Sequence, residues 1–252
     1  MCHDLSLFVG YQKHLKTDFP ALDIIADDYL LETDRHFIAQ VHAPQPVIYQ
    51  SDNRLHGAAS EWGIIASYMN TEASVKQYRN SMVNARSEKL FEKASYWSRI
   101  RNQRCLVPVS GIYEHRKIEG WKKKLPYFIS LKNEPLFYLP GLYEYTPAHQ
   151  TGEAIGTFTI LTRAANSLMK QIHNDGANQH RMPLFLPLET AKGWINTSSS
   201  DDEIQDIINY EMPATGLNAW PVFSIRGKQI REDGKEIHEP YDWGEEVVAI
   251  NI

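Results

Sequence analysis

The stretch over residues 104–114 constrains the fold more than any other part of the chain. It is a run of mostly apolar residues that is interrupted at Ser110 and Gly111 and then resumes. This pattern predicts a strand, a bend and a second short strand. Glu114, the only acidic residue of the stretch, follows directly on its core-forming residues. Because a carboxylate buried alone is costly, we interpret Glu114 as paired or as part of a functional site.

Short apolar runs separated by turn residues predict further strands and short helices. Strands are expected at residues 3–9, 58–66, 157–162, 181–186 and 220–225, and the runs at 126–131 and 136–145 predict a hairpin. Helices are expected at residues 84–93, 95–101, 166–171, 188–195 and 202–210. The 252-residue chain is 42% hydrophobic, which suffices for a substantial core. We therefore expect an α+β fold in a single domain over residues 1–252, with a polar, acidic tail from about residue 226.

Composition and motifs exclude several classes of protein. The chain has no apolar run long enough to span a bilayer and no signal peptide, so we expect a cytoplasmic protein without a membrane partner. The ten histidines are scattered, the two cysteines are far apart, and no Gly-rich phosphate loop occurs. Neither a metal ion nor a cofactor is therefore expected.

Charge is unevenly distributed along the chain. Between Arg79 and Lys124, 12 Lys and Arg stand against 4 Asp and Glu, whereas the whole chain has a net charge of −5. A basic middle segment in an acidic chain suits local attraction of an anion such as a phosphate backbone. A solvated basic face without a partner is the alternative interpretation.

Cys2 would become the first residue if the initiator Met1 were removed. The exposed α-amine, with a pKa of about 7.7–8.0, would then lie beside a thiol with a pKa of about 8.5. Such a 1,2-aminothiol condenses with an aldehyde: the amine forms an imine, and the thiol closes a five-membered thiazolidine. An electropositive surface would also favour the thiolate. Taken alone, a cysteine at position 2 is weak evidence, and an accidental cysteine is the alternative interpretation.

Other polar residues are candidates for binding and proton transfer. Asn84 and Arg86 stand at the expected helix entry, where a guanidinium suits phosphate. His173 and His180 flank a loop-like interval, and either is suited to general acid–base work. Trp62 offers a flat ring that could stack on a base. The alternatives are an ordinary helix entry, surface histidines and a core tryptophan.

Together these segments resemble one family, the SRAP (SOS-response-associated peptidase) family, whose members protect abasic sites in single-stranded DNA. The matching segments are residues 1–2, 61–65, 84–88, 104–114, 172–173 and 181–183, in family order. The resemblance implies a mixed or antiparallel, barrel-like sheet surrounded by short helices. It also implies loss of Met1, a thiazolidine crosslink between Cys2 and the opened sugar, and an autopeptidase activity that cleaves after Met1.

The resemblance assigns roles to residues of this chain. Asn84 would orient the cysteine and the sugar, and Glu114 would move protons around the Cys2 amine and in Schiff-base steps. His173 would act as acid–base on the sugar, with His180 as the alternative because it adjoins Arg181. DNA contacts are expected from Arg86, Arg181, Trp62 and Arg104. The partner would be single-stranded DNA with abasic sites, bound by a monomer that associates with the nucleoid when it is engaged on DNA.

Departures from the family pattern leave two other hypotheses open. The usual Cys-Gly-Arg start is Cys2-His3-Asp4 here, and His115 replaces a Trp that follows the Tyr-Glu pair in the family. A binder of single-stranded DNA without covalent chemistry is one alternative. The other is an N-terminal-nucleophile amidohydrolase, in which the Cys2 thiolate attacks an amide.

Overall fold

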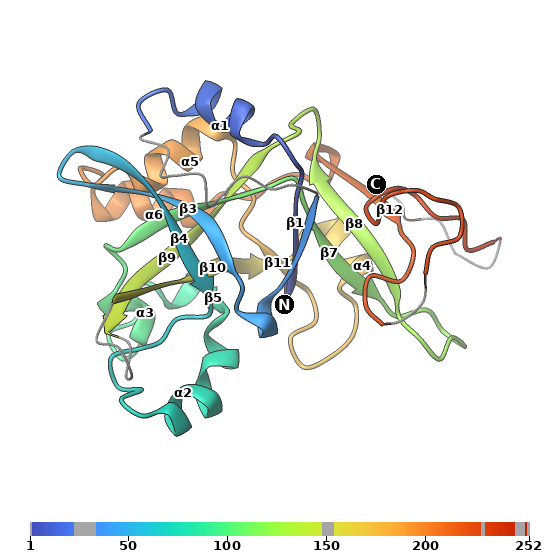
Figure 1. The fold of residues 1–252 in the computed structure, drawn as a ribbon, viewed down its shortest axis with the longest axis horizontal. Helices are drawn as coiled ribbons and strands as arrows, with labels where there is room; N and C mark the ends of the chain where they lie inside the picture. The colour runs from blue at the N-terminus through green and yellow to red at the C-terminus, as the bar shows by residue number, and fades with distance from the viewer. Residues whose placement is uncertain (1, 23–33, 148–153, 228–229, 245–249, 251–252) are drawn as a thin grey trace.

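Two β-sheets organise the molecule in a computed structural model, which describes residues 2–22, 34–147, 154–227, 230–244 and 250 (Figure 1). The first sheet is antiparallel throughout. Its strands, in spatial order, are β12 (Leu217–Pro221), β8 (Leu125–Leu131), β7 (Gly111–Arg116), β1 (Asp4–Leu7) and β2 (Arg35–Ile38).

The second sheet is mixed and closes on itself. Its strands, in spatial order, are β11 (Arg181–Pro183), β10 (Ala154–Ala164), β4 (Arg54–Trp62), β3 (Pro44–Ser51), β6 (Arg104–Val109) and β9 (Phe137–Pro147). Because β9 also pairs with β10, the strands from β10 to β9 form a ring. β5 (Asn84–Arg86) adds to β10 in parallel, as β4 does. The expected α+β class with a barrel-like mixed sheet is confirmed.

The bend at Ser110 and Gly111 joins the two sheets. β6 belongs to the ring and β7 to the first sheet, and the Ser110 amide between them donates to the Ser6 carbonyl at 2.8 Å. A Cβ on Gly111 would lie 2.1 Å from the Phe128 ring, so only glycine allows this close approach. The predicted strand, bend and strand are confirmed, and the bend carries Glu114 from the ring to the first sheet.

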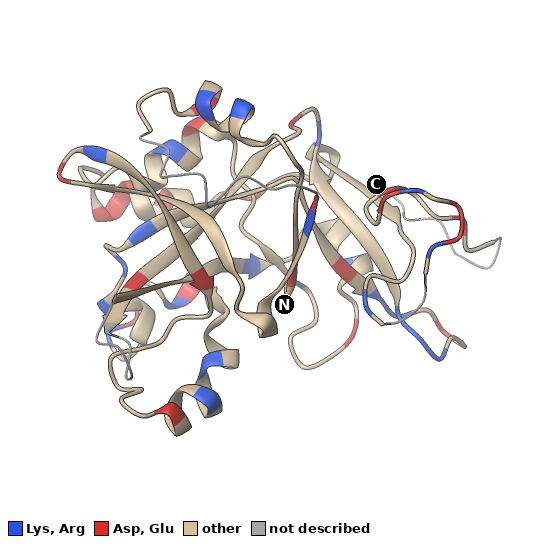
Figure 2. Ribbon diagram, viewed as in Figure 1, with Lys and Arg blue, Asp and Glu red and all other residues tan. Residues whose placement is uncertain are grey.

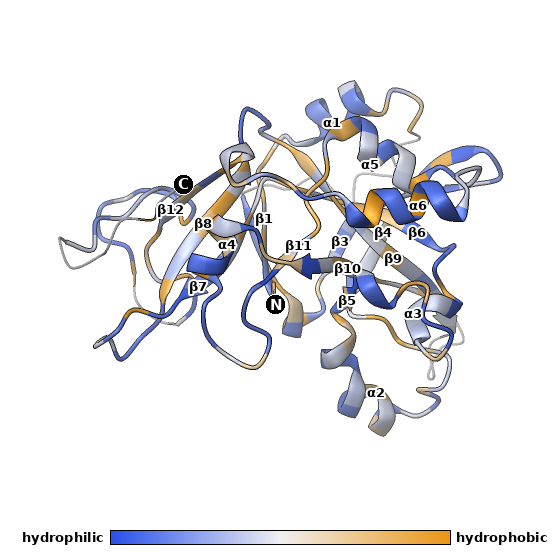
Figure 3. Ribbon diagram, turned by 180° about the vertical axis from the view of Figure 1, so that it is seen from behind, coloured by the Kyte–Doolittle hydropathy of each residue, from blue (hydrophilic) through white to orange (hydrophobic). Residues whose placement is uncertain are grey.

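Short helices cover the sheets. They are α1 (Gln12–Asp18), α2 (Glu72–Tyr78), α3 (Tyr96–Arg99), α4 (Ser167–Ile172), α5 (Leu188–Ile195) and α6 (Asp201–Asn209). Side-chain caps begin several of them: Ser95 caps α3, Asn166 caps α4, and Ser200 forms a capping box with Glu203 at α6. α6 buries Ile204 and Ile208 and leaves a polar outer face (Figure 3).

Three expectations for local structure were wrong. Residues 84–86 form strand β5, because their backbone pairs with β10. Only Ser87–Lys89 of the expected helix are helical, in a 3₁₀ turn. β8 and β9 do not pair with each other: β8 joins β7 and β12, and β9 joins β6 and β10. The last strand is β12, which ends at Pro221, earlier than expected.

The described part of the tail packs against the body of the protein beside β12 and β8 (Figure 1). Val222 forms a β-bridge with Pro240, and the Trp243 indole donates to the Val222 carbonyl at 3.0 Å. Ile237 and Trp243 add apolar contacts to the core clusters. Within the described residues, no helix has the length and apolar character needed to cross a membrane.

Candidate functional site

Cys2 lies where the two sheets meet. It precedes β1, whose pairing with β7 sets Asp4 opposite Tyr113, the neighbour of Glu114. From the other sheet, the Asn84 amide on β5 donates to the Cys2 carbonyl at 2.8 Å. The Cys2 side chain is fully buried, and its thiol contacts the Asp4 carbonyl at 3.6 Å. Segments 82 residues apart in the sequence thus meet at the second residue of the chain.

Asn84 combines one satisfied and one open polar atom. Its Nδ2 is bound to Cys2, but its buried Oδ1 has no hydrogen-bond partner among the described residues. An unsatisfied buried acceptor is costly, and in native proteins it often marks a functional position. The Oδ1 atom is suited to accept from a Cys2 amine or from a sugar hydroxyl.

Glu114 is the principal candidate for proton transfer. Its side chain is buried, and its Oε1 has no partner within the described parts of the chain. Burial raises the pKa of Glu114 to about 7, with the Asp4 carboxylate adding to the rise. Near neutral pH the group is thus divided between acid and carboxylate, which is the range that favours general acid–base catalysis.

The environment of Cys2 favours the neutral thiol. Burial, followed by the Glu114 carboxylate, raises the pKa of Cys2 well above its usual range. The expectation that an electropositive surface promotes the thiolate is therefore wrong for this state of the chain. A reaction at Cys2 would need a base to take the thiol proton, and Glu114 is close enough to affect the thiol electrostatically.

Of the two candidate histidines, only His173 lines the same cleft as Glu114. It follows α4, is 8% exposed, and its Nδ1 lies 3.0 Å from the Arg181 carbonyl oxygen. Burial lowers the pKa of His173 to about 4, so the imidazole is neutral at neutral pH. His180 is exposed and is not part of the cleft lining, although its amide donates to the His173 carbonyl at 2.8 Å.

An open, polar cleft of about 420 Å³ lies over these groups. Besides Glu114 and His173 it is lined by His3, Asp4, His115, Lys124, Asp175, Gly176, Ala177, Asn178 and Arg226. Cys2 itself is not part of the lining, but the two residues that follow it are. The cleft thus leads to the buried cysteine from the side of β1.

Arg86 and Arg181 both flank the end of β10. β5 and β11 pair with opposite edges of this strand near Thr162. The exposed Arg86 donates to Asn178 Oδ1 at 2.9 Å, which places its guanidinium beside the loop that lines the cleft. Arg181 forms a bidentate pair with Glu88 at 2.6 and 3.0 Å and also donates to the Thr162 carbonyl. A phosphate would have to compete with Glu88 for Arg181, whereas the hydrogen bond of Arg86 is to the neutral Asn178 side chain.

Trp62 and Arg104 do not line the cleft, so its geometry gives no support to DNA contacts from them, which stay a prediction. The Trp62 ring is fully buried against Phe158, and its indole donates to the Val83 carbonyl at 2.7 Å. Arg104 is buried and donates to the carbonyls of Trp194 and Asn196 at 2.6 and 2.8 Å, at the end of α5. Each side chain thus donates to carbonyl groups inside the structure.

The basic middle segment does not form one surface. Its Lys and Arg residues lie at widely separated parts of the ribbon, from the turn that follows α2 to the loop between β7 and β8 (Figure 2). Arg79 and Arg101 pair with Glu61 and Asp201. Lys124 lies at the cleft, where it pairs with Asp175 at 2.8 Å. Local charge at the cleft therefore depends on a few side chains rather than on the whole segment.

A three-residue cluster beside Cys2 was missed in the sequence. The buried Asp4 accepts from Arg226 at 3.0 and 2.8 Å and contacts the His36 ring at 2.8 Å. Although burial opposes ionisation, His36 and Arg226 hold the pKa of Asp4 below its usual value. The sequence does show an acidic residue, Asp4, at the start of an apolar strand. Its partners could not be identified there, because His36 and Arg226 lie 32 and 222 residues away. Within the described residues, no three His, Cys, Asp or Glu side chains gather to hold a metal ion.

Comparison with known proteins gives consistent matches. The sequence model of the family described as "SOS response associated peptidase (SRAP)" matches residues 1–226. "Abasic site processing protein YoqW" of Bacillus subtilis is 31% identical over 203 residues, which cover 79% of this chain and 84% of that protein. "Abasic site processing protein HMCES" of Xenopus tropicalis is 28% identical over 188 residues, which cover 67% of this chain and 52% of that protein.

A solved structure agrees with the sequence matches. The crystal structure of a protein from Bacteroides thetaiotaomicron is similar to this chain with a TM-score of 0.75 and 28% identity, and the match covers 95% of this chain and 97% of that one. Since the family model matches the chain from its first residue through the central stretch and both arginines beside β10, this protein belongs to the SRAP family.

Proposed function

We propose that this protein processes abasic sites in single-stranded DNA by linking Cys2 covalently to the opened sugar. The names of relatives such as YoqW support abasic-site processing. The observation that carries the covalent step is the bond from Asn84 to the Cys2 carbonyl, beside a buried Glu114 with an open carboxyl oxygen. Few structural roles need an unpaired carboxyl oxygen on Glu114 and an unpaired amide oxygen on Asn84 around one cysteine.

The first requirement of the proposal is removal of Met1, which lies outside the described residues. With Met1 attached, the Cys2 nitrogen is an amide and cannot form an imine. Cleavage after Met1 by the protein itself, by hydrolysis of this peptide bond, is part of the proposal. Cys2 is covered in the full chain, so Met1 removal must also open a path from the cleft to the amine.

The reaction then proceeds in three steps. The Cys2 amine attacks the C1′ aldehyde of the ring-opened sugar and gives a carbinolamine. Protonated Glu114 donates to the departing hydroxyl, so that water leaves and an iminium ion, which keeps its N–H proton, forms. The Glu114 carboxylate then takes the thiol proton, and the sulfur adds to the iminium carbon to close the thiazolidine. In sum, aldehyde and aminothiol give thiazolidine and one water, with Glu114 restored.

The remaining candidates would hold the sugar and its phosphates. His173 is neutral, so it can accept a proton from the sugar ring hydroxyl as the ring opens. Asn84 would orient both Cys2 and the sugar through its two amide atoms. Arg86, and Arg181 where phosphate displaces Glu88, would neutralise the strand on either side of the lesion. We propose that a monomer acts in this way on DNA in the cytoplasm.

The test uses the two cysteines of the chain as a matched pair. We expect wild type, incubated with a single-stranded oligonucleotide that has one abasic site, to give a conjugate that survives heating on a denaturing gel. Cys2→Ala should abolish the conjugate, whereas Cys105→Ala should keep it, because Cys105 is buried in β6 away from the cleft.

Mass measurement of the mature chain completes this test. A conjugate should form only from chains that lack Met1. An undiminished conjugate in Cys2→Ala would refute the role of Cys2. Salt-sensitive binding without any conjugate, from a chain that begins with Cys2, would instead indicate a non-covalent binder.

A further inference from the structure

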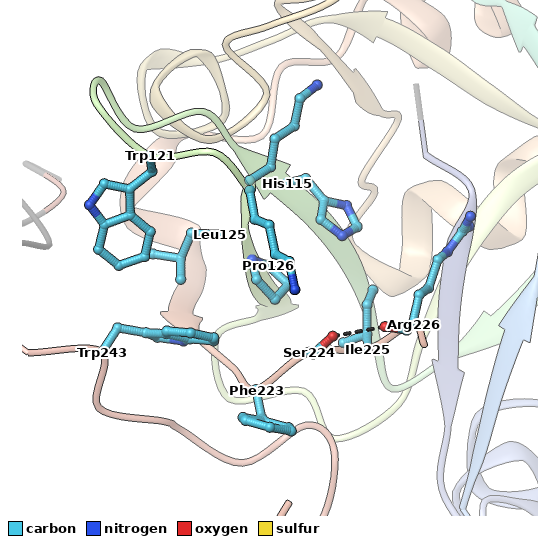
Figure 4. A pocket seen from close by; sticks show the side chains of 11 residues that line it. His115, Trp121, Leu125, Pro126, Phe223, Ser224, Ile225, Arg226 and Trp243 are labelled. Carbon is cyan, nitrogen blue, oxygen red and sulfur yellow. Dashed lines mark hydrogen bonds between the residues drawn. The ribbon is translucent and has the colours of Figure 1, made fainter. Parts of the chain in front are cut away.

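A second pocket adjoins the cleft and differs from it in having aromatic side chains in its wall. It encloses about 300 Å³, and three aromatic side chains, Trp121, Phe223 and Trp243, form much of its wall (Figure 4). Trp121 belongs to the loop between β7 and β8, and the other two follow β12 in the C-terminal segment. All three rings are half-buried. Trp121 and Trp243 pack partly against the core, and the rest of their aromatic surface faces the pocket.

The rings are fixed in place by backbone contacts. The Trp243 indole donates to the Val222 carbonyl at 3.0 Å, and the Tyr241 amide donates to the Pro221 carbonyl at 2.9 Å. The Phe223 and Trp243 rings are nearly parallel, at 12° and 6.1 Å between centroids, and Trp121 meets Trp243 edge-on at 6.2 Å. Such a preformed aromatic wall costs little ordering when a flat ligand binds.

The aromatic pocket is continuous with the catalytic cleft. Three residues, His115, Lys124 and Arg226, line both. His115 directly follows Glu114, and Arg226 is bound to Asp4, two residues from Cys2. In Figure 4, His115 and Arg226 stand on the side of the pocket opposite Trp121. A ligand in the aromatic pocket would thus be a close neighbour of a group bound at Cys2.

The charges around the pocket suit an anionic ligand with a flat ring. Lys123, Lys124 and Arg226 line it, and the described residues contribute no Asp or Glu to its lining. Lys124 and Arg226 are each paired with one carboxylate, whereas Lys123 is exposed at the rim. Aromatic rings beside lysines are the combination that binds the bases and phosphates of single-stranded nucleic acid.

We propose that this aromatic pocket receives the nucleobase next to the abasic site on the same DNA strand, an inference that rests on the proposed function. Trp121, Phe223 and Trp243 provide the aromatic surface for this base, and His115 lines the pocket with them. Trp243 lies beyond residues 1–226, which match the family, so this base contact would be a property of this chain.

The test compares two oligonucleotides that differ only beside the lesion. One carries an abasic site between ordinary thymidines. In the other, the two flanking nucleotides are tetrahydrofuran spacers, which have no base and cannot open to an aldehyde. With DNA below saturation, we expect wild type to form the conjugate about tenfold faster with flanking bases. Trp121→Ala and Trp243→Ala should bring the two rates close together, and Ile230→Ala, an exposed change in the same C-terminal segment, should keep the wild-type preference.

A second variant covers the case in which Trp243→Ala does not fold. If Trp243→Ala fails to fold by circular dichroism, Trp121→Ala carries the test. A wild-type protein without preference, or folded variants that retain it, would overturn the inference.

If no conjugate forms with any strand, the proposed function fails. A binding assay then tests separately whether the aromatic pocket receives a base. A strand with 2-aminopurine beside a tetrahydrofuran lesion should lose fluorescence on binding wild type, through stacking on the rings. Quenching that is absent, or that persists in Trp121→Ala, would exclude a base at this site.

Discussion

At the scale of single residues, Glu114 shows how burial creates reactivity. Its position at the end of β7 removes it from water, and burial brings its pKa to about 7. The same burial raises the pKa of Cys2 and lowers that of His173 to about 4. All three groups are therefore held in neutral or half-ionised forms, as needed where protons move between an amine, a thiol and a sugar.

Replacing Glu114 should separate chemistry from binding. We expect Glu114→Gln to slow conjugate formation about 100-fold, because the amide cannot transfer protons, while affinity for DNA changes little. Arg86→Ala should do the reverse and weaken binding roughly fivefold, since it removes a phosphate contact. Single-turnover rates at saturating DNA and equilibrium binding to a strand with a tetrahydrofuran lesion measure the two effects. Equal losses of rate in both variants would contradict this assignment.

The same substitution should change how stability depends on pH. The pKa of Glu114 is higher in the folded protein than its usual value of about 4.3 in an unfolded chain, so the folded state binds its proton more tightly. Stability from this group is present below about pH 4 and is lost as pH rises towards 7. Glu114→Gln does not lose this stability. Its free energy of unfolding should therefore rise relative to that of wild type by on the order of 3 kcal/mol between pH 4 and pH 8. Urea unfolding at several pH values tests this, and parallel pH profiles would contradict it.

At the scale of elements, the junction of β6 and β7 decides where Glu114 lies. The chain crosses from the ring to the first sheet within one residue, and the Phe128 ring of β8 packs against the backbone of Gly111. The turn residues Ser110 and Gly111 predict a bend here, but the close contact with β8 becomes visible only in the fold.

A methyl group at this junction should be strongly destabilising. We expect Gly111→Ala to lower the free energy of unfolding by about 3 kcal/mol, because its Cβ would lie 2.1 Å from the Phe128 ring. Gly193→Ala in α5 is the matched control: its Cβ would meet Ile207 at 3.5 Å, and helix propensity favours alanine. Urea denaturation of both variants provides the comparison. A Gly111→Ala protein as stable as wild type would show that the junction yields easily.

At the scale of the whole molecule, the C-terminal segment is connected to the start of the chain. Arg226 reaches Asp4 across 222 residues of sequence, and His36 completes the cluster. The segment that follows Arg226 returns to β12 through the Val222–Pro240 bridge. One ion pair thus joins the tail, the aromatic pocket and the region of Cys2.

Breaking this connection should loosen the tail. In a double-mutant cycle, we expect Asp4→Asn and Arg226→Gln to be coupled by on the order of 1 kcal/mol, because the pair is bidentate and one partner is buried. Arg226→Gln should also speed proteolytic cleavage after residue 226. Unfolding by urea and limited proteolysis are the measurements, and additive single-variant effects would argue against a direct connection.

The sequence alone determined the residues that could do the chemistry and most of the elements that carry them. Glu114 was a candidate because it follows an apolar run, and local patterning predicts such runs well. Cys2 was a candidate as the residue after Met1, Asn84 as part of an expected helix entry, and His173 as a histidine beside a loop-like interval. The barrel-like mixed sheet followed from the resemblance rather than from periodicity, and the ring of strands agrees with it.

Only the tertiary structure decided which polar residues face the cleft. Trp62 and Arg104 look like DNA contacts in sequence but satisfy buried carbonyls, and Asp4 looks unremarkable but binds Arg226. The strands at 126–131 and 136–145 were recognised, yet their partners were not, because pairing depends on long-range contacts that no local pattern records. Burial likewise set the pKa of Glu114, since desolvation arises from residues that are distant in the chain.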